Sequence, residues 1–324
     1  MAGARRTAGR RRRCGPGARR REHREAIRRD CQALLEDCMT DSLSVDNALG
    51  RLAVYIDKTT SAAQLADIAL DMRPSHAPRR CWLEEIATML RGKADAFDKV
   101  RRAAACVSHD RPDSEPTAMT VKRLAGSFDR AAAISPAASV QLSSLGDEHR
   151  LSTTTAEIVS WLEQQGFLGA HKHILDIGCG IGRLGHALGT QAGYVVGIDI
   201  SSRMIEIARR RCAGLVNVEF RLTSGLDLGD FADASFDGVL ALDSFPYLVL
   251  AGVAERHFSE IARVLRRGGM AAILNYSYRT SPGIDSRDIS RLSHACGMDV
   301  AVDGEMPFGS WDGMVFLVRR AGGT

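Results

Sequence analysis

Several features that define other classes of protein are missing from the sequence. No apolar run approaches the roughly 18 residues that a membrane-spanning helix requires. The eight cysteines, at positions 14, 31, 38, 81, 106, 179, 212 and 296, include no C-x-x-C pair and have no paired histidines beside them. These absences argue against a transmembrane segment, a disulfide framework and a zinc site, and they favour reduced thiols in a cytoplasmic protein.

The first 24 residues lack serine and any apolar stripe, and residues 1–30 hold 12 arginines, no lysine and three acidic residues. Residues 1–30 therefore have a net charge of +9. Because the whole chain has a net charge of +4, residues 31–324 together have a net charge of −5. We expect residues 1–24 to be a disordered, solvated tail, or a stretch upstream of the true start codon. A transit peptide, a nucleic-acid tether and a membrane contact are the alternatives, the first disfavoured by the missing serine. The acidic remainder gives no reason to expect nucleic acid or a membrane as a partner.

Residues 25–106 have apolar side chains at helical spacing, and Pro74 and Pro78 interrupt the pattern. The pattern predicts a small all-α domain of three to five helices that carries no recognisable chemistry. We interpret it as a structural or dimerising module, with a partner-binding domain or a lid as alternatives. Residues 107–120 contain two prolines and several acids, which predicts a linker before a catalytic domain at 121–324.

Residues 173–185 combine a short apolar strand, a glycine-rich turn and the start of a helix. Glycine lets the backbone pass close to a ligand because no Cβ intervenes, and the following helix directs free N–H groups at the same place. Gly180, Gly182 and Gly185 satisfy the dinucleotide pattern G-x-G-x-x-G, with Asp199 downstream. A nicotinamide-binding fold is therefore one interpretation of this turn, although the pattern alone is weak.

The fuller arrangement Asp176-x-Gly178-x-Gly180-x-Gly182 resembles motif I of the class I S-adenosylmethionine-dependent methyltransferases. Residues 195–201 and 235–243 resemble the second and fourth strands of that family, and residues 261–269 resemble the helix and turn before its fifth strand. The resemblance covers about residues 125 to 320. It implies a Rossmann-like α/β fold with a seven-stranded, mostly parallel, doubly wound sheet of order 3-2-1-4-5-7-6, in which strand 7 is antiparallel.

Strands and helices alternate after the glycine turn, as a parallel sheet covered on both faces requires. We predict a helix at 154–165, capped by Ser152 or Thr153, that packs on the first strand. Residues 311–313 suit a hairpin before the reversed last strand. The remaining strands are predicted at 174–177, 195–199, 218–222, 237–242, 270–275, 299–302 and 314–318, and the remaining helices at 183–189, 202–212, 253–265 and 285–296.

The resemblance also implies a cofactor site at the carboxyl ends of the strands. The glycine turn would hold the methionine portion of S-adenosylmethionine, and Asp199 would accept from the ribose hydroxyls. Asp176 would hold the methionine portion through the loop or a water, or would only cap local N–H groups. The remaining expected contacts, to the methionine portion and the adenine, are Gly178, Cys179, Gly180, Gly182, Ile200, Met204, Ser224, Gly225, Leu226 and Leu242. Asp227 stands one position late for the usual acid of this family after strand three.

Residues 242–247 follow strand four, where cofactor and acceptor would meet. Asp243 and Tyr247 are our candidate catalytic residues, and Phe245 and Tyr247 could wall an acceptor pocket or only pack under the loop. The methyl group would move by in-line displacement, so the protein mainly aligns the reactants and excludes water. His149, His257 and Tyr276 are further candidate bases by position. Asp243 and Asn275 supply only part of a metal-binding set, so no metal is expected.

Three functions compete at this point. The first is methyl transfer to a small-molecule acceptor, for which the cofactor motifs are intact. The second is a protein or RNA methyltransferase recruited through the N-terminal helical and basic region, which the missing paired prolines after strand four disfavour. The third is a non-catalytic module with a damaged cofactor site, and the motifs show no such damage. Transfer to oxygen, nitrogen, carbon or sulfur cannot be separated from the sequence.

Overall fold

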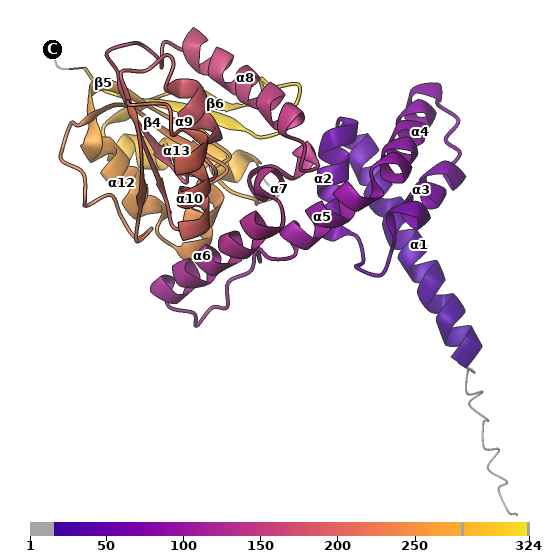
Figure 1. The fold of residues 1–324 in the computed structure, drawn as a ribbon. Coiled ribbons are helices and arrows are strands. Elements are labelled where there is room, and N and C mark those ends of the chain that lie inside the picture. Colours follow the sequence, from indigo (N-terminus) through magenta and orange to yellow (C-terminus); the bar gives the residue numbers. More distant parts are fainter. Residues whose placement is uncertain (1–15, 280–281, 323–324) are drawn as a thin grey trace, which may run out of the picture.

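The computed structural model describes residues 16–279 and 282–322 (Figure 1). The greater part of the predicted tail, residues 1–15, lies outside this range. Helix α1 (Pro16–Thr40) already begins at Pro16, so residues 16–24 are helical where disorder was predicted. Proline is favoured at the first helical position, and the arginine, alanine and glutamate that follow are good helix formers, which accounts for the earlier start. No helix among the described residues is long and apolar enough to cross a membrane.

Helices α1, α2 (Val45–Tyr55), α3 (Ala62–Asp71), α4 (Ala77–Gly92) and α5 (Ala94–Ala104) form a bundle, with as many helices as the upper end of the sequence-based range. Ser44 caps α2 by accepting from the Asn47 N–H. Ser61 and Gln64 form a capping box at the start of α3. The core of the bundle consists of side chains that are almost fully buried, including Leu35, Leu49, Leu52, Leu65, Leu83, Ile86, Leu90 and Phe97.

Helices α6 (Thr117–Ile134) and α7 (Pro136–Val140) and the short 3-10 helix η1 (Leu142–Ser144) lie between the bundle and the sheet (Figure 1). Helix α6 begins at Thr117, inside the predicted linker, and Pro116 is its N-cap residue. Ala131, Ala138 and Leu145 bury their side chains in the core of the bundle. The segment between α5 and the sheet is therefore packed structure, and only residues 105–116 connect the two parts without a helix.

The sheet has seven strands in the order β3-β2-β1-β4-β5-β7-β6, which confirms the predicted topology. Only β7 runs against its neighbours, since it pairs antiparallel with both β5 and β6. The strands are β1 (His173–Ile177), β2 (Tyr194–Asp199), β3 (Val218–Leu222), β4 (Phe236–Leu242), β5 (Leu265–Leu274), β6 (Met298–Glu305) and β7 (Val315–Arg320). The carboxyl ends of β1, β2 and β4, where the candidate site was expected, therefore lie side by side.

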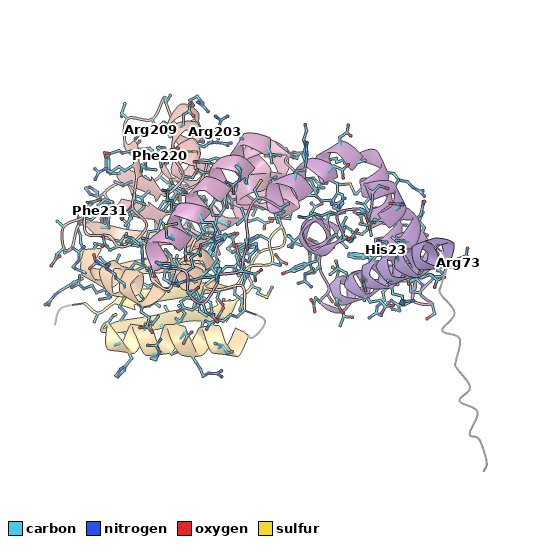
Figure 2. All side chains as sticks on the ribbon, turned by 90° about the horizontal axis from the view of Figure 1, so that it is seen from below. His23, Arg73, Arg203, Arg209, Phe220 and Phe231 are labelled. Atoms are coloured by element: carbon cyan, nitrogen blue, oxygen red, sulfur yellow. The ribbon has the colours of Figure 1, made fainter. Side chains whose placement is uncertain are left out.

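Apolar side chains of the strands alternate between two packed layers. Helices α8 (Glu148–Gln164) and α9 (Arg183–Leu188) cover the face that contains Ile174 of β1. Helices α11 (Phe245–Ala251), α12 (Ala254–Val264) and α13 (Pro282–Ala295) cover the face that contains Leu175. Helix α10 (Ser202–Arg211) packs beside β3, where the Arg209 guanidinium donates to the Phe220 carbonyl at 2.8 Å (Figure 2).

Two local predictions were wrong. Helix α8 begins at Glu148 and is capped by Asp147, whose carboxylate accepts from the N–H groups of His149 and Arg150, so Ser152 and Thr153 lie inside the helix. Helix α11 was not predicted, because Pro246 was interpreted as part of a loop although proline suits the first turn of a helix. The predicted hairpin before β7 is present, since β6 and β7 pair antiparallel, and residues 306–314 form its nine-residue connection.

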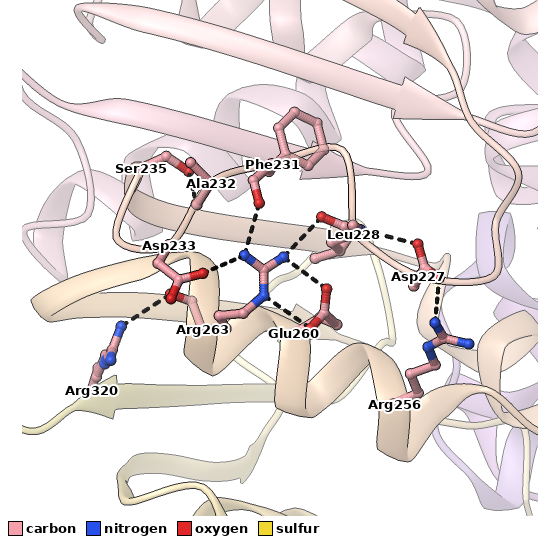
Figure 3. A network of polar contacts seen from close by, with 11 residues as sticks. Asp227, Leu228, Phe231, Ala232, Asp233, Ser235, Arg256, Glu260, Arg263 and Arg320 are labelled. Atoms are coloured by element: carbon pink, nitrogen blue, oxygen red, sulfur yellow. Dashed lines mark hydrogen bonds and ion pairs between the residues drawn. The ribbon is translucent and has the colours of Figure 1, made fainter.

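An arginine of α12 holds the loop between β3 and β4 against that helix (Figure 3). The Arg263 guanidinium donates to the carbonyls of Leu228 and Phe231 and pairs with Asp233 and Glu260, at distances of 2.7 to 3.0 Å. These charge-assisted bonds raise the pKa of Arg263. The loop that follows the carboxyl end of β3 is therefore held in one conformation.

Candidate functional site

The glycine turn after β1 is held against the end of β2. The N–H groups of Gly178 and Cys179 donate to the Ile198 carbonyl at 2.8 and 3.0 Å, and the Gly180 N–H donates to Asp199 Oδ2 at 2.9 Å. Gly178, Gly180 and Gly182 have φ angles of +72°, +52° and +73°. Side chains with a Cβ rarely adopt these angles, which explains why glycine occupies all three positions.

Neighbouring atoms would also obstruct a Cβ at these glycines. A Cβ on Gly178 would lie 2.3 Å from Ser244 Cβ, and one on Gly180 would lie 2.7 Å from Val140 Cγ1. Ser244 is fixed in this place because its hydroxyl donates to the Ile177 carbonyl at 2.6 Å. The turn is therefore bordered by the chain after β4 on one side and by α7 on the other.

Asp176 is a buried carboxylate with an unpaired oxygen. The residue is 2% exposed, and its Oδ2 has no hydrogen-bond partner. Desolvation raises the pKa of Asp176 to about 7, against the opposing positive charge of Arg183. Buried polar atoms in proteins are nearly always hydrogen-bonded. An unpaired carboxylate oxygen beside a glycine turn is the arrangement expected where a cationic or hydrogen-donating ligand binds.

Asp199, at the end of β2, is oriented by backbone N–H groups. Its Oδ2 accepts from Gly180 and its Oδ1 from Ser201 at 2.8 Å. Burial raises the pKa of Asp199 to about 6, and these backbone hydrogen bonds oppose the rise. Each carboxylate oxygen can accept more than one hydrogen bond, so Asp199 keeps acceptor capacity for a ligand that carries hydroxyl groups.

The residues predicted to contact the adenine fall into two groups. Ile200, Leu226 and Val121 of α6 pack together, and a Cβ on Gly225 would lie 2.5 Å from Ile200 Cγ2. Met204 packs in a separate cluster around Ile181 and is 2% exposed. Ser224 is exposed, and its hydroxyl accepts from the Leu226 N–H at 3.3 Å. Asp227 forms an ion pair with Arg256 at 2.5 Å.

Asp243 follows Leu242, the buried last residue of β4, and adopts a left-handed conformation with a φ of +53°. Asn275, at the end of the neighbouring strand β5, also has a positive φ of +65°. The Asn275 amide donates to Asp243 Oδ1 at 2.6 Å, and its carbonyl oxygen accepts from the Met314 N–H at 2.9 Å. Burial raises the pKa of Asp243 to about 6, against the Asn275 hydrogen bond and the charge of Arg183. Strained residues of this kind are concentrated at functional sites.

Tyr247 lies in the first turn of α11, at the same edge of the sheet. The other candidate bases do not join it. His257 is 2% exposed and its ring nitrogen hydrogen-bonds the Val253 carbonyl of its own helix at 3.1 Å. Tyr276 is 3% exposed and stacks on Phe245 in the core below α11 and α13. His149 is an exposed residue of the first turn of α8.

Three residues around these carboxylates were not among the site residues expected from the sequence. Asp129 of α6 accepts from the Ser201 hydroxyl at 2.6 Å and from the Arg203 N–H at 3.0 Å, so it caps α10 beside Asp199. Arg183 is 7% exposed and donates to Gln141 and Thr155, while its charge faces Asp176 and Asp243. Of these residues, only Ser201 has a recognisable signal in the sequence. Serine is a preferred N-cap residue, and Ser201 lies between the end of β2 and the start of α10.

Among residues 16–279 and 282–322, no group of three or more histidine, cysteine, aspartate or glutamate side chains has the arrangement of a metal site. All cysteines in this part of the chain are free. Cys179 is buried within the glycine turn, and burial raises the pKa of its thiol far above the usual value.

Comparisons with known proteins agree with this geometry. Residues 174–269 match the model of a family described as a methyltransferase domain. A demethylmenaquinone methyltransferase from Tropheryma whipplei is 37% identical over 111 residues, which are 34% of this chain and 44% of that protein. An O-methyltransferase from Penicillium expansum is 33% identical over 155 residues, which are 47% and 51% of the two chains. The chain spans about half the length of the curated relatives it matches.

Solved structures with a similar sheet include magnesium protoporphyrin IX methyltransferase from Synechocystis with bound S-adenosylmethionine, at 20% identity and a TM-score of 0.42, covering 56% of this chain and 83% of that one. The predicted strand order is present, and the family match spans the glycine turn, Asp199 and the strand that ends before Asp243. Residues 174–269, the central part of the sheet domain, therefore resemble a methyltransferase domain.

Proposed function

We propose that the protein transfers a methyl group from S-adenosylmethionine to a small-molecule acceptor. The observation that carries this proposal is the unpaired, buried Oδ2 of Asp176 beside glycines that have no room for a Cβ. The α-amino group of the cofactor is a cation that would supply the missing partner. The methionine portion would pass along the backbone of the turn, whose conformation requires glycine and which Ser244 and Val140 hold in place.

The remaining groups fit the rest of the cofactor. Asp199 is oriented by two backbone N–H groups and keeps capacity to accept from the ribose hydroxyls. Ile200, Gly225 and Leu226 offer apolar contact for the adenine, next to Val121 of α6. When bound, the cofactor supplies a methyl group on a sulfonium, which is a good leaving group. The chain's own residues then have to align the acceptor and exclude water.

Asp243 and Tyr247 stand where the acceptor would enter, beyond the end of β4. The Asn275 amide fixes the Asp243 carboxylate at 2.6 Å, so this group would orient a donor on the acceptor rather than move freely. One of the two curated relatives described above is named for demethylmenaquinone, a small molecule, and the other is named for oxygen as the methylated atom. These names support a small molecule as the acceptor class.

Calorimetric titration with S-adenosylmethionine tests the proposal. Asp199→Ala removes the carboxylate that would accept from the ribose, and we expect a loss of affinity of about 10- to 1,000-fold, because hydrogen bonds to charged groups contribute about 1.5–3 kcal/mol each. Asp303→Asn changes an exposed carboxylate of β6 and should bind as the unchanged protein does. No measurable binding to the unchanged protein would refute the proposal.

A further inference from the structure

Four aromatic side chains from separate parts of the chain meet beyond the ends of β4 and β5. They are His109 from the segment before α6, Phe128 from α6, Tyr247 from α11 and Tyr278 from the chain after β5. We call these residues the aromatic cluster. The Tyr247 ring contacts Phe128, Tyr278 and His109 at centroid distances of 4.9, 5.7 and 5.8 Å, and His109 meets Tyr278 edge-on at 5.2 Å.

The aromatic cluster is not part of a filled core. Tyr278 is 48% exposed, His109 is also exposed, and Phe128 and Tyr247 are half-buried. None of the four belongs to the buried core of the bundle or of the sheet. Exposed aromatic side chains that gather in one place mark a binding surface more often than a structural one.

The position of the cluster relates it to the methyl-transfer site. Tyr247 stands three residues after Ser244, whose Cβ borders the Gly178 backbone. Desolvation raises the pKa of Tyr247, with a smaller contribution from the nearby negative charge of Asp243. The same carboxylate contributes to the raised pKa of Tyr278. Because Tyr247 stands four residues after Asp243, the cluster adjoins the chain that follows β4, on the proposed acceptor side of the glycine turn.

The cluster contains a phenolic hydroxyl next to a histidine nitrogen. Tyr247 Oη lies 3.3 Å from His109 Nε2, within hydrogen-bonding distance. Desolvation against the surrounding rings lowers the pKa of His109, while the adjacent Asp110 opposes this shift. The rings of Tyr247 on α11 and Tyr278 after β5 face this ring, and Asp110 on its own segment adds a negative charge. The imidazole is thus neutral near pH 7 and can accept a proton from a phenol that approaches as Tyr247 does.

We propose that the aromatic cluster binds an acceptor with a planar aromatic ring and a hydroxyl group, and that His109 Nε2 accepts the proton of this hydroxyl during methyl transfer. The proposal rests on the proposed function, since it concerns the acceptor of that same reaction. Phe128, Tyr247 and Tyr278 supply edges and faces for ring contacts. Residues 105–116 are then part of the active site, where the sequence had indicated a linker.

In this reaction the acceptor oxygen would form a bond to the methyl carbon, and the bond from that carbon to the sulfonium sulfur would break. The sulfur would keep the electron pair and become a neutral thioether. The hydroxyl proton moves to His109 Nε2. Because the His109 side chain reaches solvent, the proton then passes to water and the neutral ring is restored.

The test compares His109→Gln with His294→Gln, which changes an exposed histidine of α13. Calorimetry with S-adenosylhomocysteine first establishes that each protein binds the nucleoside. Two probes then separate the roles of ring and proton: 4-nitrophenol, which ionises readily, and 4-methylphenol, which does not. With 4-methylphenol we expect His109→Gln to lower kcat by about 10²- to 10⁴-fold, the usual contribution of a general base. With 4-nitrophenol the loss should be much smaller.

A second readout does not depend on turnover. At the same pH, bound 4-nitrophenol should show more phenolate absorbance in the unchanged protein and in His294→Gln than in His109→Gln, because only His109→Gln lacks the group that accepts the proton. Equal losses with the two phenols, or an unchanged phenolate signal in His109→Gln, would refute a role for His109 as the base. If the protein binds S-adenosylhomocysteine but neither phenol, the aromatic acceptor is refuted while the proposed function stands. Failure to bind S-adenosylhomocysteine would refute the proposed function itself.

Discussion

The burial of Asp176 costs stability, and binding of the proposed cofactor would offset this cost. Its carboxylate is buried, one oxygen has no partner, and the charge of Arg183 compensates only part of the desolvation. The pKa of Asp176 rises to about 7 in the folded protein, well above the usual value near 4. A carboxyl whose pKa is raised on folding stabilises the fold below its unfolded pKa, and this contribution is lost as the pH rises through the folded pKa.

We therefore expect Asp176→Asn to make the ligand-free protein more stable at pH 8, on the order of a few kcal/mol, since each unit of pKa shift corresponds to about 1.4 kcal/mol. At pH 5 the advantage should be smaller, because the carboxyl is then neutral in the folded protein and ionised only in the unfolded chain, and below about pH 4 it should vanish. Denaturant unfolding at the two pH values measures this. The same variant should bind S-adenosylmethionine more weakly, since an amide cannot neutralise the ammonium group. A variant that is less stable than the unchanged protein at pH 8 would contradict the account.

Among residues of the site, the sequence identified those that a motif fixes in place. Asp176, the glycines and Asp199 belong to one strand, one turn and the next strand, so their proximity follows from a parallel pair. His109 and Asp129 could not be predicted in the same way. His109 reaches Tyr247 across 138 positions of sequence, and Asp129 reaches Ser201 across 72. No local pattern encodes such distant contacts, since they depend on how α6 and the segment before it pack on the sheet edge.

At the scale of elements, the strands were predictable because apolar runs alternate with helical patterns from residue 173 onward, whereas their order followed from the resemblance of the motifs to a known family. The elements that were missed are those without a strong local signal. Helix α11 is only seven residues long and contains a proline, and α7 has five residues, most of them small. Both are stabilised by tertiary packing more than by helix propensity, as short helices are in general.

Helix α12 offers a test of what holds the loop between β3 and β4. Arg263→Met removes a guanidinium that donates to two carbonyls and two carboxylates, and we expect a loss of about 2–3 kcal/mol in the free energy of unfolding because those acceptors lose charged donors. Arg256→Met, on the same helix, removes an exposed ion pair with Asp227 of the loop. We expect it to lower the free energy of unfolding by about 1 kcal/mol or less. Denaturant unfolding measures both. Equal losses would show that the network around Arg263 (Figure 3) is no stronger than an ordinary surface pair.

At the scale of the whole molecule, the bundle and the sheet are joined through a short series of contacts. Gly50 of α2 lies against the backbone of η1, where a Cβ would be 3.1 Å from the Ser143 nitrogen. Ala138 of α7 is buried in the core of the bundle, and Val140 of the same helix borders Gly180 in the glycine turn. Packing in the bundle is therefore two contacts away from the backbone that would hold the cofactor.

This arrangement predicts that a change in the bundle alters cofactor binding. Gly50→Val should displace η1 and α7, lower the free energy of unfolding by about 1–3 kcal/mol as overpacking usually does, and weaken the binding of S-adenosylhomocysteine severalfold. Gly92→Val is the matched control, because a Cβ there meets nothing within 4 Å. Calorimetric binding and thermal unfolding of both variants measure the effect. If Gly50→Val lowers stability but leaves the affinity unchanged, the bundle and the glycine turn are energetically independent, and the contacts through η1 and α7 transmit nothing between them.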